Sequence, residues 1–164
     1  MMKKFIKEWM PYAIIIVLVI LIKKYIITPI KVNGPSMNNT LYDKDIMLLD
    51  EISYRFLSIK RFDIVVVKYG NELIIKRVIG LPGEKISCSD NKLYINGEIL
   101  RENYSIGITS DFSEITISEN EYFVLGDNRE NSIDSRIIGS IPIKQIKGKA
   151  ILTIYPFQRF GTKN

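Results

Sequence analysis

Ser36 and Lys76 are the two residues of this chain whose types and settings could support nucleophilic catalysis. Lys76 lies in the apolar segment 73–79, and the alternation of side chains along a strand places it on one face with Ile74 and Val78. Burial between such neighbours would lower the pKa of the amine from about 10.4, so that its neutral form could accept a proton. By itself, this pattern more often indicates a lysine on an edge strand, with its aliphatic stem covering apolar surface and its amine in water.

Ser36 follows Gly34 and Pro35, which fix a turn in front of it. Glycine allows the backbone to approach a ligand closely, and backbone amides at such a turn can stabilise an oxyanion. The same residues are also common in ordinary loops. The Gly-Pro-Ser sequence is therefore a weak signal by itself.

The chain contains no histidine, and this narrows the possible chemistry. The absence excludes Ser-His-Asp triads, Cys-His dyads and histidine-based zinc sites, whereas a Ser-Lys pair remains possible. The single cysteine, Cys88, permits no intramolecular disulfide. The net charge of +5 comes from lysines and arginines scattered along the chain, which is typical of a solvated surface and not of a nucleic-acid site. We expect no metal, no other cofactor and no nucleic-acid partner.

A polar segment at residues 126–136 directly follows the apolar run 121–125. It holds three acids, two arginines, two asparagines and two serines. Such a segment could be a solvated loop with weak surface ion pairs, or a polar network beside an active site. Composition does not separate these two interpretations.

The elements that must position these residues are mainly strands. Apolar or alternating runs separated by turn residues predict strands at 46–49, 64–67, 73–79, 93–95, 121–125 and 150–154. Ser89 and Lys92 match an S-x-x-K spacing, but the turn residues Asp90 and Asn91 between them predict a hairpin and not a catalytic helix start. Residues 103–118 are polar and irregular and are expected to form an exposed excursion. The fold class predicted is mainly β, with an antiparallel, twisted or barrel-like sheet.

Residues 9–22 form an uncharged apolar run of 14 residues, which is about 21 Å of helix. Extension to 5–27 would span about 34 Å if the flanking lysines reach the headgroups. No small-x-small cleavage site follows, and a soluble helix of this kind would be apolar on all sides. We therefore expect an uncleaved transmembrane anchor in residues 1–28 and a β-rich catalytic domain in residues 29–164. The flanking charges are nearly balanced and do not set the orientation.

Four segments together resemble the bacterial type I signal peptidases, in the order in which that family carries them. Residues 34–41 (Gly-Pro-Ser-Met-Asn-Asn-Thr-Leu) are similar to the nucleophile box, and residues 61–67 are similar to a box rich in Arg, Asp and Val. Residues 76–84 (Lys-Arg-Val-Ile-Gly-Leu-Pro-Gly-Glu) match the lysine box, and residues 126–136 match the last box. The ordered set is far more specific than any one box.

The resemblance implies a role for each of these residues. Ser36 would attack the scissile carbonyl, and neutral Lys76 would take its proton and pass it to the leaving amine. Ser132 would orient Lys76, and the Ser36 backbone N–H would stabilise the oxyanion with a group near Gly34. A supporting polar network would consist of Arg77, Asp127, Arg129, Asp134 and Arg136.

The family also implies a setting and a substrate. The chain resembles the compact Gram-positive type, with its N-terminus inside the cell and its catalytic domain on the extracytoplasmic face of the cell membrane. It is expected to be a monomer whose partners are the lipid bilayer and the signal peptides of exported preproteins. The substrate would carry small residues at the first and third positions before the cut and would bind extended, as an added strand.

Two residues depart from the family pattern. Asn39 stands where the family usually has proline, and Phe62 stands where it usually has a small residue. Neither departure removes a reactive group, but both bear on the geometry of their loops.

Other functions also fit parts of the sequence. A membrane-tethered β module could bind partners without chemistry, and it would then tolerate loss of Ser36 and Lys76. A specialised Ser-Lys peptidase could process one dedicated substrate. The self-cleaving SOS repressors also use a Ser-Lys pair, but they are soluble and carry a DNA-binding region where this chain has an apolar segment.

Overall fold

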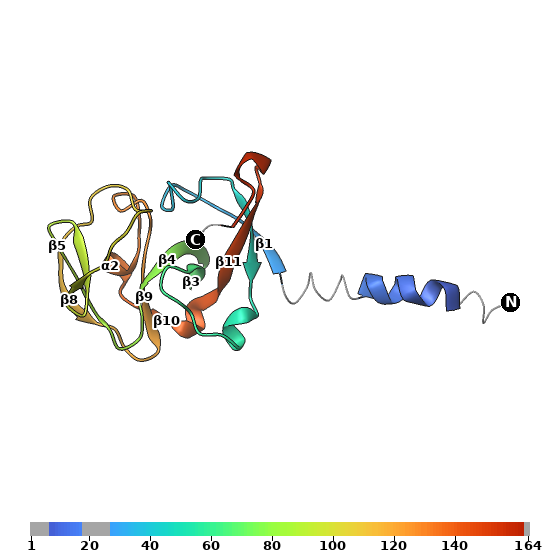
Figure 1. The fold of residues 1–164 in the computed structure, drawn as a ribbon, viewed down its shortest axis with the longest axis horizontal. Helices are drawn as coiled ribbons and strands as arrows, with labels where there is room; N and C mark the ends of the chain where they lie inside the picture. Colours follow the sequence, from blue (N-terminus) through green and yellow to red (C-terminus); the bar gives the residue numbers. More distant parts are fainter. Residues whose placement is uncertain (1–6, 18–26, 163–164) are drawn as a thin grey trace.

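The computed structural model describes residues 7–17 and 27–162, and β-strands dominate the second of these ranges (Figure 1). Within it, every strand pairing in both sheets is antiparallel. The predicted mainly β, antiparallel fold class is therefore confirmed. The four helices of this range are short: η1 (Ser53–Arg55), α2 (Ser135–Ile138), η2 (Ile143–Gln145) and η3 (Phe157–Arg159).

The larger sheet carries both candidate catalytic segments. Its seven strands lie in the order β1 (Ile27–Lys31), β2 (Ile46–Asp50), β11 (Ile146–Tyr155), β3 (Ile64–Tyr69), β4 (Glu72–Gly80), β9 (Glu121–Leu125) and β10 (Ile141–Pro142). β1 is an edge strand, and β4 pairs with β9 only from Arg77 onward. Residues 72–76 of β4 therefore have β3 on one side and, among the described residues, no strand on the other.

The smaller sheet has four strands in the order β7 (Glu98–Ile99), β6 (Lys92–Ile95), β5 (Lys85–Ser89) and β8 (Phe112–Thr116). β5 and β6 form the predicted hairpin between Ser89 and Lys92. Its two turn residues, Asp90 and Asn91, have φ values of 51° and 59°, which asparagine and aspartate tolerate better than most residues.

The core explains why β3 has an uninterrupted apolar sequence. Ile64 and Val66 pack into one cluster and Val65 and Val67 into another, so this strand is buried on both faces. A strand buried on both faces loses the alternation of apolar and polar residues. A third cluster fills the space between β4, β9 and the smaller sheet.

The prediction for residues 103–118 was wrong in part. Residues 112–116 form β8, which pairs with β5, instead of belonging to an irregular excursion. The side chains of β8 are nearly all exposed, so the strand shows no apolar face in the sequence.

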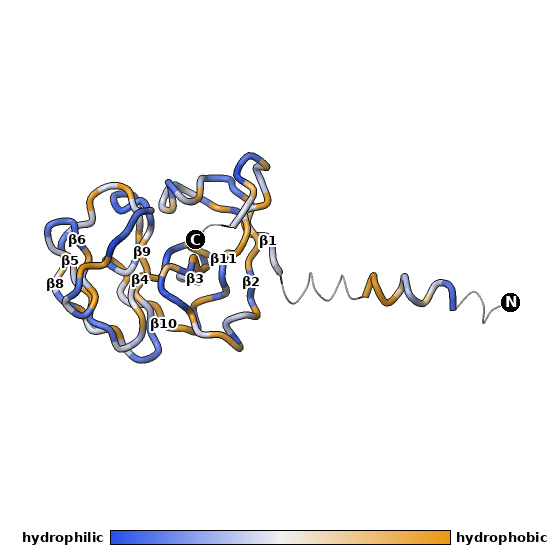
Figure 2. Tube along the Cα trace, viewed as in Figure 1, coloured by the Kyte–Doolittle hydropathy of each residue, from blue (hydrophilic) through white to orange (hydrophobic). Residues whose placement is uncertain are grey.

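Residues 7–17 form a helix, and its residues become more hydrophobic toward residue 17 (Figure 2). Within the two described ranges, none of the helices has both the length and the hydrophobicity that a membrane span requires. The predicted anchor also includes residues 1–6 and 18–26, which lie outside the described residues.

Candidate active site

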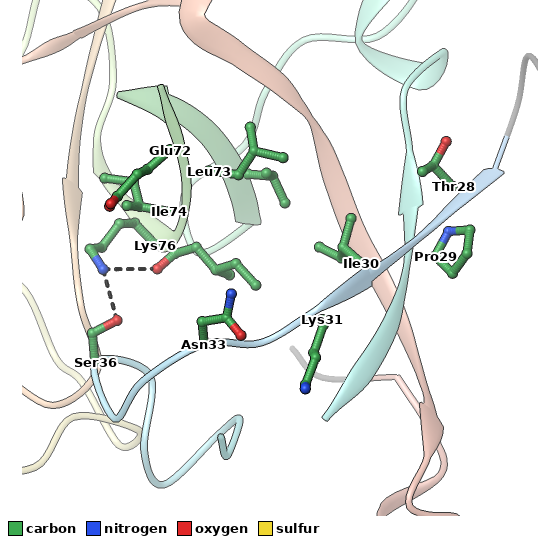
Figure 3. A pocket seen from close by; sticks show the side chains of 12 residues that line it. Thr28, Pro29, Ile30, Lys31, Asn33, Ser36, Glu72, Leu73, Ile74 and Lys76 are labelled. Atoms are coloured by element: carbon green, nitrogen blue, oxygen red, sulfur yellow. Dashed lines mark hydrogen bonds between the residues drawn. The ribbon is translucent and has the colours of Figure 1, made fainter. Parts of the chain in front are cut away.

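Lys76 lies at the end of the free edge of β4, where it pairs with Val65 of β3 and directly precedes the part of β4 that pairs with β9. Its side chain is buried and donates hydrogen bonds to Ser36 Oγ over 2.8 Å and to the Ile75 carbonyl over 3.1 Å (Figure 3). The structure thus brings together the two predicted catalytic residues, 40 positions apart in the chain. The alternative of an edge lysine whose amine reaches water does not hold, because only 3% of Lys76 is exposed.

Burial changes the chemistry of the Lys76 amine. Loss of hydration lowers the pKa of Lys76 to about 8, against the opposing effect of the Asp134 and Asp127 carboxylates. The positive charge of Arg136 lowers it further. A lysine with a pKa of about 8 is neutral in about one molecule in ten at pH 7 and in about half at pH 8, so it can act as a base.

The loop that carries Ser36 is fixed by apolar anchors on its C-terminal side. Met37 and Leu41 are fully buried in the core cluster beneath β1 and β2. Burial of each contributes roughly 1.5–3 kcal/mol to the stability of this arrangement. Asn128 fixes the other side, since its backbone N–H donates to the Ser36 carbonyl over 3.0 Å and its side-chain amide to the Pro35 carbonyl over 3.2 Å.

Gly34 adopts a φ of 83°, and its N–H donates to Asp43 Oδ1 over 2.9 Å. This bond fixes the turn before Ser36 and occupies the Gly34 amide. The Ser36 backbone N–H, in contrast, has no acceptor among the described residues. The Ser36 N–H is therefore free to donate to a ligand, and its predicted role at an oxyanion site, together with a group near Gly34, stays a prediction.

Arg77 follows Lys76 and points to the opposite face of β4. It forms a fully buried ion pair with Asp127, with Nη2–Oδ2 and Nε–Oδ1 distances of 2.7 and 2.9 Å. The Thr40 hydroxyl bonds to both charged groups, because it donates to Asp127 Oδ2 and accepts from Arg77 Nη2. This pair therefore ties the lysine strand, the nucleophile loop and the segment 126–136 together.

The segment 126–136 is a buried polar network and not a solvated loop. Arg129 donates to the Gly126 carbonyl and pairs with Glu102, while Arg136 pairs with Asp134 over 2.9 Å. Burial alone would raise the pKa of Asp134, but hydrogen bonds from Arg136 and the Gly126 N–H outweigh it and hold the pKa below its usual value. The five residues predicted for the supporting network all take part in these ion pairs or in the Arg77–Asp127 pair, and their supporting role stays a prediction.

Ser132 lies beside the dyad but does not contact Lys76 through a hydrogen bond in this structure. Its Oγ is buried and makes no hydrogen bond of normal geometry among the described residues, although it lies close enough to Asp134 to help lower the pKa of that carboxylate. It packs against Gly126, where an added Cβ would lie 2.2 Å from Ser132 Oγ and 2.6 Å from the Ser36 carbonyl oxygen. Only glycine fits this close approach. The implied role of Ser132 in orienting Lys76 stays a prediction.

Three residues of the site, Thr40, Asn128 and Glu102, had no role predicted from the sequence. Thr40 and Asn128 lie inside the matched boxes, so their position in those motifs was the available signal. Glu102 lies outside every box, and no sequence signal identified its pairing with Arg129.

A groove leads to the dyad between the free edges of β1 and β4. It has a volume of about 700 Å³ and is lined by Thr28, Pro29 and Ile30 on one side and Leu73 and Ile74 on the other, with Ser36 and Lys76 at one end (Figure 3). Two unpaired strand edges beside a groove can accept an extended peptide through main-chain hydrogen bonds. Among residues 7–17 and 27–162, no group of three or more acidic, histidine or cysteine side chains is arranged to hold a metal ion.

Comparison with known proteins identifies the family. The family model described as "Signal peptidase, peptidase S26" matches residues 6–155. Signal peptidase I of Bacillus amyloliquefaciens is 35% identical to this chain, over 94% of this chain and 91% of its own length. Signal peptidase IB of Staphylococcus aureus (strain COL) is 34% identical, over 97% of this chain and 94% of its own length. The crystal structure of a signal peptidase I from Enterococcus faecalis V583 is similar with a TM-score of 0.52 and 35% identity, over 57% of this chain and 97% of that one. The chain therefore belongs to the signal peptidase family, peptidase S26.

Proposed function

We propose that this protein removes N-terminal signal peptides from exported preproteins, with Ser36 as the nucleophile and neutral Lys76 as the general base. The observation that carries the proposal is the 2.8 Å contact between Ser36 Oγ and the amine of a lysine that is almost completely buried. Both partners of the reaction are thus within hydrogen-bond distance before substrate binds, as general-base catalysis requires.

The reaction takes place in two steps. Lys76 removes the hydroxyl proton as Ser36 Oγ attacks the scissile carbonyl, and the free Ser36 N–H stabilises the oxyanion that forms. The protonated lysine then donates its proton to the leaving amine. A water molecule, activated in the same way by neutral Lys76, hydrolyses the acyl-enzyme and releases the signal peptide with its new carboxylate.

The groove suits an extended segment with small side chains near the cut. A peptide strand between β1 and β4 would bond to both free edges and would reach Ser36 at the end of the groove. Small residues at the first and third positions before the cut would be selected, because larger ones would collide with the apolar lining.

We also propose that the end of the larger sheet where β1 begins faces the bilayer. Only four residues lie between Ile22, the end of the apolar run, and Ile27 in β1, so the Cα atoms of Ile22 and Ile27 are at most about 18 Å apart. Ile27 pairs with Asp50, and shortly after Asp50 the chain exposes Phe56 and Leu57 (81% and 64%). Exposed apolar residues at the end where an apolar segment joins the domain fit a membrane surface. Preprotein would then enter the groove from the Thr28 and Leu73 end.

The direct test is cleavage of a preprotein bearing an Ala-x-Ala signal peptide by the detergent-solubilised full chain, with product masses measured. We expect one cut after the second alanine, no cut with Ser36→Ala, and a strong loss of cleavage when either alanine becomes leucine. If the folded wild type cuts no such preprotein, even with lipid present, removal of signal peptides from exported preproteins in general would be contradicted. The remaining functions would be a peptidase with one dedicated substrate or a membrane-tethered module without catalytic activity.

The pH dependence of cleavage gives a further prediction. Because Lys76 must be neutral and its pKa is lowered to about 8, kcat/KM should rise about tenfold per pH unit below pH 8 and level off above it. Initial rates between pH 6 and 10 would show this limb, with circular dichroism at each pH to verify that the protein stays folded. A profile that is flat between pH 6 and 9 would contradict a lysine base in this environment.

A further inference from the structure

Tyr104 lies where three segments of the site meet, although it belongs to none of the boxes that resemble the family. Its backbone carbonyl accepts a hydrogen bond from the side-chain amide of Asn39 over 3.0 Å. The Arg77 guanidinium lies 4.0 Å above the centre of its ring, and the Phe62 ring meets that ring edge-on at 5.7 Å. Tyr104 therefore contacts both residues that depart from the family pattern, and also the neighbour of Lys76.

The segment around Tyr104 is itself held firmly to the segment 126–136. The Tyr104 hydroxyl donates to Glu102 over 2.6 Å, and Glu102 pairs with the buried Arg129. The backbone N–H of Ile106 donates to the Asp127 carbonyl over 2.8 Å, and the Ile106 carbonyl accepts from the Arg129 N–H over 2.9 Å. We call residues 101–109 the strap, because they bind across the segment 126–136 and reach the nucleophile loop through Tyr104.

Asn39 and Phe62 both have backbone conformations that need support from their surroundings. Their φ values are 87° and 73°, in a region that asparagine tolerates and phenylalanine rarely adopts. Proline, whose ring fixes φ near −65°, could not adopt the conformation of Asn39. The nucleophile loop of this chain thus follows a path that the family's usual proline would not allow, and Tyr104 contacts it at that point.

We propose that Tyr104 is a positioning residue, whose ring holds Arg77 and whose backbone carbonyl holds the Asn39 turn, so that Ser36 meets Lys76. This proposal rests on the proposed function of the dyad, and it deepens it by naming a residue outside the matched boxes. Tyr104 does not line the groove, so it should affect the rate of chemistry and not the binding of substrate. Substitution of the side chain tests the contribution of the ring, which contacts Arg77 and Phe62, because any residue at position 104 would offer the same carbonyl to Asn39.

The test compares Tyr104→Ala with Tyr104→Phe and with Tyr54→Ala. Tyr54 is a matched control, because it is also a partly buried tyrosine whose hydroxyl donates to a carboxylate, that of Asp63, but it lies in η1 and packs in another cluster. At a temperature where all variants are folded, Tyr104→Ala should lower kcat by about 10- to 100-fold with KM nearly unchanged. Tyr104→Phe should stay within about threefold of wild type, as should Tyr54→Ala.

A second measurement does not depend on any substrate. NMR titration of lysine-labelled protein should give a Lys76 midpoint near pH 8 in wild type and Tyr54→Ala, and a higher midpoint in Tyr104→Ala, because a displaced loop admits water to the amine. A folded Tyr104→Ala variant with the Lys76 midpoint and kcat of wild type would overturn the proposal. If wild type cuts no preprotein, the proposed function fails, and the NMR midpoint alone then decides whether Tyr104 positions the dyad.

Discussion

Substitution of Lys76 by methionine is expected to lower the rate of signal-peptide cleavage by roughly 10²- to 10⁴-fold, the usual contribution of a positioned general base. The same substitution is expected to make the protein more stable. Methionine resembles the lysine stem in length and carries no charge, so it fits a site from which water is excluded. Activity and stability should therefore change in opposite directions at this position.

The expected gain in stability follows from the pKa of Lys76. Burial lowers the pKa of Lys76 from 10.5 to about 8. This difference means that, when the amine is protonated in both the folded and the unfolded chain, the free energy of unfolding of the wild type is lower by about 3 kcal/mol. Between pH 8 and pH 10.5 the unfolded chain binds the proton and the folded chain does not, so wild-type stability at this site rises with pH. The advantage of Lys76→Met should be largest below pH 8 and should vanish near pH 10.5.

Chemical denaturation at pH 7 and pH 10, together with cleavage assays, would measure both effects. Lys68→Met is the matched control, since Lys68 lies on the neighbouring strand β3 but is exposed. It should leave both cleavage and stability almost unchanged. A Lys76→Met variant that is less stable than wild type at pH 7, or that cuts at a similar rate, would show that Lys76 is not a buried base.

Local sequence signals were enough to mark Ser36 and Lys76 as candidates for the proposed dyad. Lys76 interrupts an apolar strand, Ser36 follows a Gly-Pro turn, and the absence of histidine leaves lysine as the base. The strand pattern could not decide whether Lys76 is buried, because that depends on the nucleophile loop, which lies 40 positions away in the chain. The ordered resemblance supplied that pairing.

The surroundings of the dyad could not be predicted, for two physical reasons. Exposed strands such as β8 carry no apolar alternation, so only their hydrogen bonds to β5 define them. The contact between Asn39 and Tyr104 joins residues that are 65 positions apart in the chain. The positive φ value of Phe62, whose ring also contacts Tyr104, cannot be predicted from the conformational preferences of phenylalanine. Departures from a family pattern indicate where local geometry changes, but not which residue supports the new geometry.

Substitution of Asp127 by alanine is expected to destabilise the protein by about 3–5 kcal/mol, because it leaves the Arg77 guanidinium buried without its counter-ion. Neither side chain of this pair is exposed to solvent, so water cannot replace the lost carboxylate. The loss would lower the melting temperature by roughly 10 °C in a domain of this size. Glu114→Ala is the matched control, since it removes the surface pair with Lys85, whose side chains are about half exposed, and should cost less than about 1 kcal/mol.

A double substitution distinguishes the contribution of the Arg77–Asp127 pair to stability from the destabilisation caused by one buried charge left without its partner. Arg77→Met combined with Asp127→Leu removes both charges and fills the space with apolar groups, so it should be less destabilising than Asp127→Ala alone. It should nevertheless cleave poorly, because Thr40 loses both of its partners in the pair and the loop that carries Ser36 loses its link to β4. Melting curves and cleavage rates of the three variants would test this. If the double variant recovered both stability and full cleavage, the pair would be dispensable for positioning Ser36, and Met37 and Leu41 in the core would be sufficient to hold the nucleophile loop.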